Sequence, residues 1–185
     1  ALRSPDDDPA YHESRRRIDH TLAMFLWRVN GEGIDANPVV RGVGDLRSSP
    51  AVTSRRGWTR EWWASAQDRY GLVTGEEVLV ELGAGTSSLV SLRLALLANV
   101  PVLPVAPEVI ATAQTYVLNK LMPNKPGGDA YHLALASHYG CAFIVTWNCK
   151  HLANPNKFAH VATINRRLGL SIPEIVTPLE LLRRI

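Results

Sequence analysis

The chain has 185 residues, of which 46 % are hydrophobic and 20 % are charged. This length suggests one domain with a substantial core, and the hydrophobic content excludes disorder over most of the chain. No run of about 18 apolar residues occurs, which argues against a membrane span. Residues 1–8 lack the charged-then-apolar pattern of a signal peptide, so we expect a cytoplasmic protein.

The formal net charge is only +3, but the basic residues are unevenly distributed. Eleven of the 20 lysines and arginines precede residue 70, and these include Arg15, Arg16, Arg17, Arg55, Arg56 and Arg60. Such residues form either a solvated surface or a face that binds phosphate. The composition therefore permits a nucleic acid partner without requiring one.

Loops separate two predicted helices in the first half of the chain. Apolar residues recur at helical spacing over residues 18–29, and a second helix is expected over residues 58–70 with Thr59 as its cap. The intervening residues 31–54 are rich in Gly, Pro, Ser and Arg, so we expect at most a short strand at Ile34 and Val39-Val40. Residues 77–82 form either a strand or the opening of a helix.

Helices and strands alternate in the second half. In chain order we expect a helix over residues 87–98, a strand over 101–105, helices over 107–121 and 129–139, a strand over 142–146, a helix over 158–168, a strand at 175–176 and a last helix from Thr177-Pro178 through Leu182. This alternation is typical of an α/β protein with a parallel sheet covered on both faces. Ligands of such sheets bind beyond the carboxyl ends of the strands.

Polar side chains occur where two of these elements begin or end. Asp129 opens a predicted helix, and Thr146 and Asn148 follow a predicted buried strand. Hard divalent cations such as Mg²⁺ or Mn²⁺ prefer oxygen ligands of this kind, so the pattern indicates metal-assisted phosphodiester chemistry. The structural alternatives are that Asp129 caps its helix, that Asn148 forms a turn, and that His132 is a packed core residue.

One segment suggests a different function. Residues 78–88 place Gly83 and Gly85 after an apolar run, as in the first motif of methyltransferases that use S-adenosylmethionine. A lone Gly-x-Gly is weak evidence, and such an enzyme also needs an acidic side chain at the end of the next strand. Glu108 already lies within the following predicted helix, so this function is kept only as a second alternative.

From about Trp58 to its end, the chain resembles the PIN-domain family, in particular the VapC-like toxins. The resemblance rests on five blocks in order, which are residues 59–63 (TREWW), 78–85 (VLVELGAG), 129–136 (DAYHLALA), 146–154 (TWNCKHLAN) and 172–178 (IPEIVTP). It implies a three-layer α/β fold with a central parallel sheet flanked by helices. It also implies metal-dependent endoribonuclease activity.

The family's acidic motifs carry over by position onto this chain. Glu81 matches the second acidic residue and Asp129 the third, while Asn148 matches the fourth position. Asp35 is the candidate for the first, with Asp45 as a weaker substitute. The resemblance thus implies that Asp35, Glu81 and Asp129 hold Mg²⁺ or Mn²⁺ and that Asn148 completes the catalytic set. Thr146, Lys150 and His151 are expected to contact the RNA substrate.

The resemblance also sets expectations about organisation and partners. Residues 1–33 are expected to be a divergent N-terminal extension with a helix, followed by a PIN-like domain over residues 34–185. The implied partners are single-stranded or looped RNA, a cognate antitoxin protein and a second copy of the chain. Trp62 and Trp63 are expected in the core or in a dimer interface. Because the first acidic motif is weak, the first alternative is a catalytically impaired module that binds RNA or protein.

Overall fold

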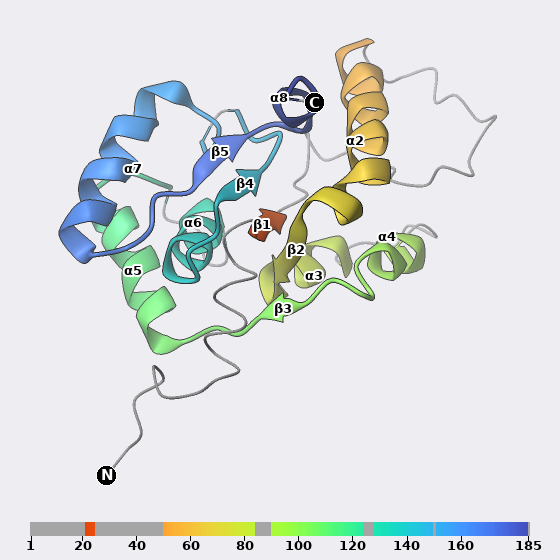
Figure 1. The fold of residues 1–185 in the computed structure, drawn as a ribbon. Coiled ribbons are helices and arrows are strands. Elements are labelled where there is room, and N and C mark those ends of the chain that lie inside the picture. The colour runs from red at the N-terminus through yellow and green to blue at the C-terminus, as the bar shows by residue number, and fades with distance from the viewer. Residues whose placement is uncertain (1–20, 25–49, 84–89, 124–127, 150, 185) are drawn as a thin grey trace.

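The computed structural model describes residues 21–24, 50–83, 90–123, 128–149 and 151–184. Within these residues the strands form one parallel sheet in the order β3-β2-β1-β4-β5 (Figure 1). They are β1 (Thr21–Met24), β2 (Gly71–Gly75), β3 (Val102–Leu103), β4 (Phe143–Val145) and β5 (Glu174–Val176). Met24 pairs with Val145, which pairs with Val176, so the carboxyl ends of β1, β4 and β5 lie level.

Helices cover both faces of this sheet. The helices α5, α6 and α7 lie on one side, and α2, α3 and α4 on the other, with α8 packed against α2 (Figure 1). Their bounds are α2 (Pro50–Arg69), α3 (Glu76–Gly83), α4 (Val90–Leu96), α5 (Pro107–Leu118), α6 (Asp129–His138), α7 (Pro155–Leu168) and α8 (Pro178–Leu182). This confirms the predicted three-layer α/β fold. No helix in the described segments is long and apolar enough to cross a membrane.

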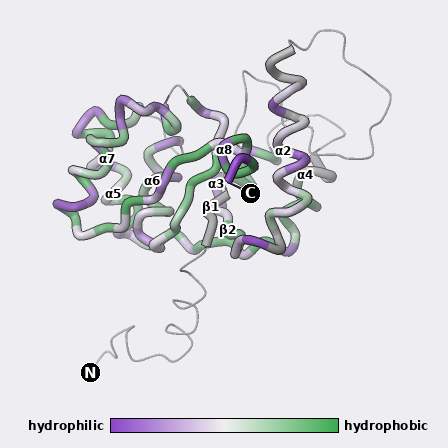
Figure 2. The backbone as a smooth tube through the Cα atoms, turned by 45° about the horizontal axis from the view of Figure 1, so that its top comes forward, coloured by the Kyte–Doolittle hydropathy of each residue, from purple (hydrophilic) through white to green (hydrophobic). Residues whose placement is uncertain are grey.

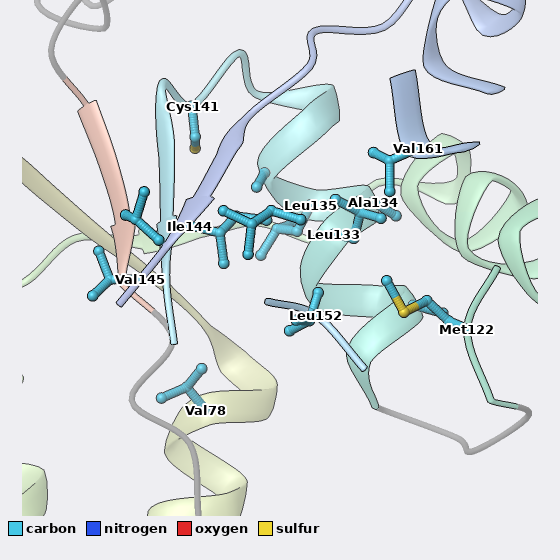
Figure 3. Packing of buried hydrophobic residues seen from close by; sticks show 14 of the residues in the cluster. Val78, Met122, Leu133, Ala134, Leu135, Cys141, Ile144, Val145, Leu152 and Val161 are labelled. Carbon is cyan, nitrogen blue, oxygen red and sulfur yellow. The ribbon is translucent and has the colours of Figure 1, made fainter. Parts of the chain in front are cut away.

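The core is centred on α6 and β4. Every residue of α6 from His132 to Ser137 is buried, as expected for a helix enclosed between a sheet and other helices. Leu133 and Leu135 lie between β4 and the outer helices, and Val145 lies on the other side of β4, towards β1 (Figure 3). Hydrophobic residues gather in the middle of the molecule, whereas most of α2 is pale or hydrophilic (Figure 2).

A buried polar network joins the helices on the α5–α7 side. The Tyr116 hydroxyl donates to Asn165 Oδ1 at 2.6 Å, and Asn165 Nδ2 donates to Ser137 Oγ at 2.9 Å and to the Ser171 carbonyl at 2.6 Å. Burial raises the pKa of Tyr116, and its hydrogen bonds to Ser137 and Asn165 oppose that rise. The network therefore ties α5, α7 and the segment after α7 to α6.

The structure differs from the sequence-based prediction near the N-terminus. A helix was expected over residues 18–29, but Thr21–Met24 form β1, the central strand of the sheet. The apolar spacing over residues 18–29 was misleading. The strand β1 has only four residues, which are too few to show the alternation of a strand, and it is paired with β2 on one side and β4 on the other. The strand proposed at Ile34 and Val39-Val40 lies outside the described residues. The domain boundary at residue 33 stays a prediction, although β1 precedes it.

Three further elements differ in detail. The helix expected over residues 58–70 begins at Pro50, so Thr59 lies inside α2, where its hydroxyl donates to the Arg55 carbonyl at 2.8 Å instead of capping the helix. The helix α7 begins at Pro155 instead of residue 158. Residues 77–82 belong to helix α3, which agrees with one of the two predicted alternatives. The strand β2 was not predicted, because only Leu72, Val73 and Thr74 separate its flanking glycines. At the C-terminus, Thr177 and Glu180 form the capping box that starts α8.

Candidate active site

The topology brings several chain segments to one edge of the sheet. Chain order reverses at β1, because the chain passes from β1 to β2 on one side and returns from β3 to β4 on the other. In parallel α/β sheets, ligands bind at the carboxyl edge near this switch point. The helix α3 starts directly after β2, and α6 starts at this edge because its far end leads into β4. Thr146 follows β4 directly.

Asp129 and Asn148 meet at this edge. Asn148 Nδ2 donates a hydrogen bond to Asp129 Oδ1 at 2.8 Å, and Asn148 Oδ1 accepts one from the backbone N–H of His151 at 3.1 Å. Asp129 occupies the first turn of α6, where the helix dipole favours a carboxylate. The residue before α6, Gly128, makes no side-chain cap. Asp129 is thus oriented by a side chain from another element, and it does not serve as the cap residue.

Thr146 holds the segment that carries Asn148. Its hydroxyl accepts a hydrogen bond from the backbone N–H of Asn148 at 3.0 Å, and its own backbone N–H donates to the Val176 carbonyl at 2.9 Å. Only 2 % of Thr146 is exposed. The structure therefore gives Thr146 a positioning contact, while its predicted contact with substrate remains a prediction.

Glu81 reaches the same edge from α3. Its Oε2 atom lies 3.7 Å from His132 Nε2, and Oε2 is buried without a hydrogen-bond partner among the described residues. His132 follows Asp129 by one helical turn, so the two side chains share a face of α6. Val78, also on α3, lies beyond Val145 at the carboxyl side of the sheet (Figure 3). The Glu81 carboxylate therefore lies beside the helical turn of α6 that carries Asp129.

The set of carboxylates is incomplete within the described residues. No group of three or more His, Cys, Asp and Glu side chains there is arranged to hold a metal ion. Asp35, Asp45 and Lys150 lie outside the described residues. The residues that directly follow β1 in the sequence are Phe-Leu-Trp-Arg-Val, and the first acidic residue after Met24 is Glu32. The position that would bring a third carboxylate from β1 therefore carries an apolar side chain.

Trp147, which lies between Thr146 and Asn148, joins the segment after β4 to α2. Its indole Nε1–H donates to Thr59 Oγ1 at 2.8 Å, and its ring centroid lies 6.1 Å from that of Trp58. The Arg55 guanidinium carbon lies 5.4 Å from the centre of the Trp147 ring. Trp62, further along α2, is buried in the core, as the sequence predicts.

These features agree with the comparison with known families. A model of the PIN domain matches residues 50–151, which is more than half of the chain. The chain belongs to the PIN-domain family. The match includes Glu81, Asp129 and Asn148, but it begins after β1 and Asp35. Neither a curated protein nor a solved structure matches the chain.

Membership of the PIN family supports a nuclease-type function in general. It also argues against the methyltransferase alternative, which required a strand running into Gly83. The structure has helix α3 there, so the apolar run of residues 78–82 presents no strand end to a cofactor. PIN domains generally use divalent metal ions, and the Glu81 and Asp129 oxygens are chemically suited to such ions.

Two contacts of this PIN domain could not be found from the sequence. The contact between His132 and Glu81 joins helices on opposite faces of the sheet. In the sequence, His132 is typical of a packed core residue and gives no sign of this contact. The hydrogen bond between Trp147 and Thr59 spans 88 positions. The only signal was that Arg55, Trp58 and Thr59 share one face of a helix.

The cysteines give a prediction beside the site. Both are free, but Cys141 is buried, with its pKa raised to about 12 by burial, whereas Cys149 is exposed next to Asn148. Because the thiolate is the reactive form, we expect a disulfide reagent at pH 8 to modify Cys149 rapidly and Cys141 only on unfolding. Cys149→Ser should abolish the fast phase and Cys141→Ser should preserve it. Two fast phases in the unaltered protein would contradict this burial of Cys141.

Proposed function

We propose that this PIN domain is a metal-dependent endoribonuclease that cleaves single-stranded or looped RNA. The observation that supports this most is the 2.8 Å hydrogen bond between Asn148 and Asp129. It joins the third and fourth family positions at the carboxyl edge of the sheet, and Glu81 lies in the same neighbourhood through its contact with His132.

The proposed cofactor is Mg²⁺ or Mn²⁺, held by Glu81 and Asp129. The buried Glu81 Oε2 atom has no hydrogen-bond partner among the described residues, and binding of a cation would compensate its burial. The donors fit in kind, since both are hard oxygen ligands, but two carboxylates are fewer than the family pattern provides. Asp35 is retained as the proposed third. Such a cation, when bound, lowers the pKa of a bound water and neutralises phosphate charge.

The chain's own residues then have distinct roles. In this proposal Asp129, which accepts a hydrogen bond from Asn148, uses its second oxygen as a metal ligand, and Asn148 contacts a phosphate oxygen through its amide. Hydrolysis requires a water oxygen to attack phosphorus while the bond to the 3′ oxygen breaks. The products are a 5′ phosphate and a 3′ hydroxyl, which takes up the proton. Thr146 and Trp147 keep Asn148 in position.

We further propose that the chain acts as a cytoplasmic VapC-like toxin, neutralised by a cognate antitoxin that covers the acidic site. Lys150 and His151 are proposed to contact the RNA, and the chain is proposed to form a homodimer. Support comes from the family resemblance of residues 146–154 and 172–178. Unpaired RNA is favoured as substrate because side chains read exposed bases more readily than the deep major groove of an RNA duplex.

A cleavage assay tests the proposal directly. Labelled single-stranded RNA is incubated with the protein in Mg²⁺ or Mn²⁺, and a parallel reaction contains a chelator. We expect products with 5′ phosphates, formed only when the cation is present and restored when it is added back. Cleavage that continues in the chelator would contradict the metal requirement, and absence of cleavage with both cations would contradict the nuclease proposal.

One observation favours a second candidate, a catalytically impaired PIN module that binds RNA or protein. No acidic residue directly follows β1, although this strand ends beside Val145 at the centre of the site. Two carboxylates hold a divalent cation more weakly than three or four do. Binding of RNA without cleavage, together with weak binding of Mn²⁺, is the result that would identify this second function.

A further inference from the structure

One face of α2 is built around Trp147. Arg55, Trp58 and Thr59 are spaced by three and four residues, so they lie together on the helix surface. All three contact Trp147, through a cation–π contact, a tilted ring contact and a hydrogen bond respectively. Trp147 is thereby immobilised, and the Arg55 guanidinium is held over its ring.

The Arg55 guanidinium has no acidic neighbour in the described part of the chain. Among the residues that the structure describes, no carboxylate lies within ion-pair distance of Arg55. Its side chain is only half-buried. A guanidinium stacked on an aromatic ring keeps its N–H groups at the edge of the plane, where they can form two parallel hydrogen bonds with a phosphate. Stacking also removes much of the rotational freedom that binding would otherwise have to restrict.

The position of Arg55 relates it to the acidic edge. Trp147 directly precedes Asn148, which is bonded to Asp129. The helix α2 leads into β2 and so runs opposite to the strands, with its N-terminal half towards their carboxyl ends. A helix of this length spans about 30 Å, whereas β2 spans about 17 Å. The first turns of α2, including Arg55, therefore project past the sheet on the side of the site.

We propose that Arg55, held over the Trp147 ring by a cation–π contact, binds a backbone phosphate of single-stranded RNA adjacent to the one that is cleaved. This rests on the proposed nuclease function and adds the residue that receives the substrate beside the carboxylates. A polyanion approaching Glu81 and Asp129 meets repulsion from both, and a fixed cation at the rim offsets it. Trp58, which is half-buried, packs against Trp147 and helps to hold its ring beneath Arg55.

Direct measurement of RNA binding tests the role of Arg55. A fluorescent single-stranded RNA is titrated in a chelator, which prevents cleavage, over a series of salt concentrations. Arg55→Gln is expected to make the slope of log K against log salt shallower by about 0.7 and to weaken binding about fivefold at 0.1 M salt. Arg55→Lys should restore the slope because it retains the charge, while recovering only part of the affinity because it lacks the planar fork.

Arg69 provides a matched control. It lies in the last turn of the same helix, so Arg69→Gln removes the same charge about 21 Å away. Equal slopes for Arg55→Gln and Arg69→Gln would overturn the proposal, because general electrostatics would then explain both. Thermal unfolding of each variant measures any structural cost separately. RNA binding without cleavage would remove the nuclease function but leave the Arg55 site, whereas absence of RNA binding by the unaltered protein overturns both.

Discussion

Asp129→Asn is expected to reduce cleavage of single-stranded RNA at least about 100-fold, since losses of 10–100-fold are usual even for residues that only support a metal ligand. Asparagine has nearly the same shape, and its amide oxygen can still accept the hydrogen bond from Asn148. The substitution therefore removes the negative charge while keeping the loop in place. The measurement is the initial rate of cleavage in Mg²⁺, together with the affinity for Mn²⁺ in the absence of RNA.

Glu108→Gln is the matched control for Asp129→Asn. Glu108 also lies in the first turn of a helix, α5, so its loss has a similar effect on helix-dipole stabilisation. We expect this variant to cleave RNA at the rate of the unaltered protein. Equal rates for Asp129→Asn and the unaltered protein would exclude Asp129 from the chemistry. A fall in rate without a fall in Mn²⁺ affinity would instead assign it to substrate positioning.

Sequence periodicity predicted most of the second half of the fold, for a physical reason. The signals that predicted its helices include Pro107 at the start of α5 and Gly169 after α7, the latter with the left-handed backbone that glycine favours. The start of α7 at Pro155 was predicted three residues late. The strands β4 and β5 are short, but each ends in two buried apolar residues, Ile144-Val145 and Ile175-Val176. The strands β1 and β2 are only four and five residues long, and so few residues carry too little pattern to distinguish a strand from a helix.

The candidate site was predictable where family motifs coincide with element ends. Asp129 at the start of α6 and Asn148 after β4 meet because the carboxyl edge of a parallel sheet gathers such positions. The contacts of Glu81 with His132 and of Trp147 with α2 depend instead on how helices pack across the sheet. Helix packing follows from the three-dimensional fit of side chains, which a linear pattern does not encode.

Asn165→Ala is expected to lower the free energy of unfolding by about 2–4 kcal/mol. Asn165 is fully buried on α7 and satisfies the Tyr116 hydroxyl, the Ser137 hydroxyl and the Ser171 carbonyl. Alanine removes the donor to the Ser171 carbonyl and leaves the Tyr116 and Ser137 hydroxyls only their mutual hydrogen bond at 3.3 Å, and it also leaves a small cavity. The buried Tyr116 hydroxyl cannot compensate by ionising, since burial raises its pKa. Urea denaturation at pH 7 measures the change.

Thr163 gives the control for the Asn165 network. It lies on the exposed side of the same helix, where its hydroxyl donates only to the Ala159 carbonyl one turn earlier. Thr163→Ala should therefore change the free energy of unfolding by less than about 0.5 kcal/mol. Equal losses for the two variants would mean that helix propensity, and not the network, determines the effect. Because Ser137 lies two turns from Asp129 on α6, folded Asn165→Ala should cleave RNA normally, which separates support of the fold from the chemistry of the site.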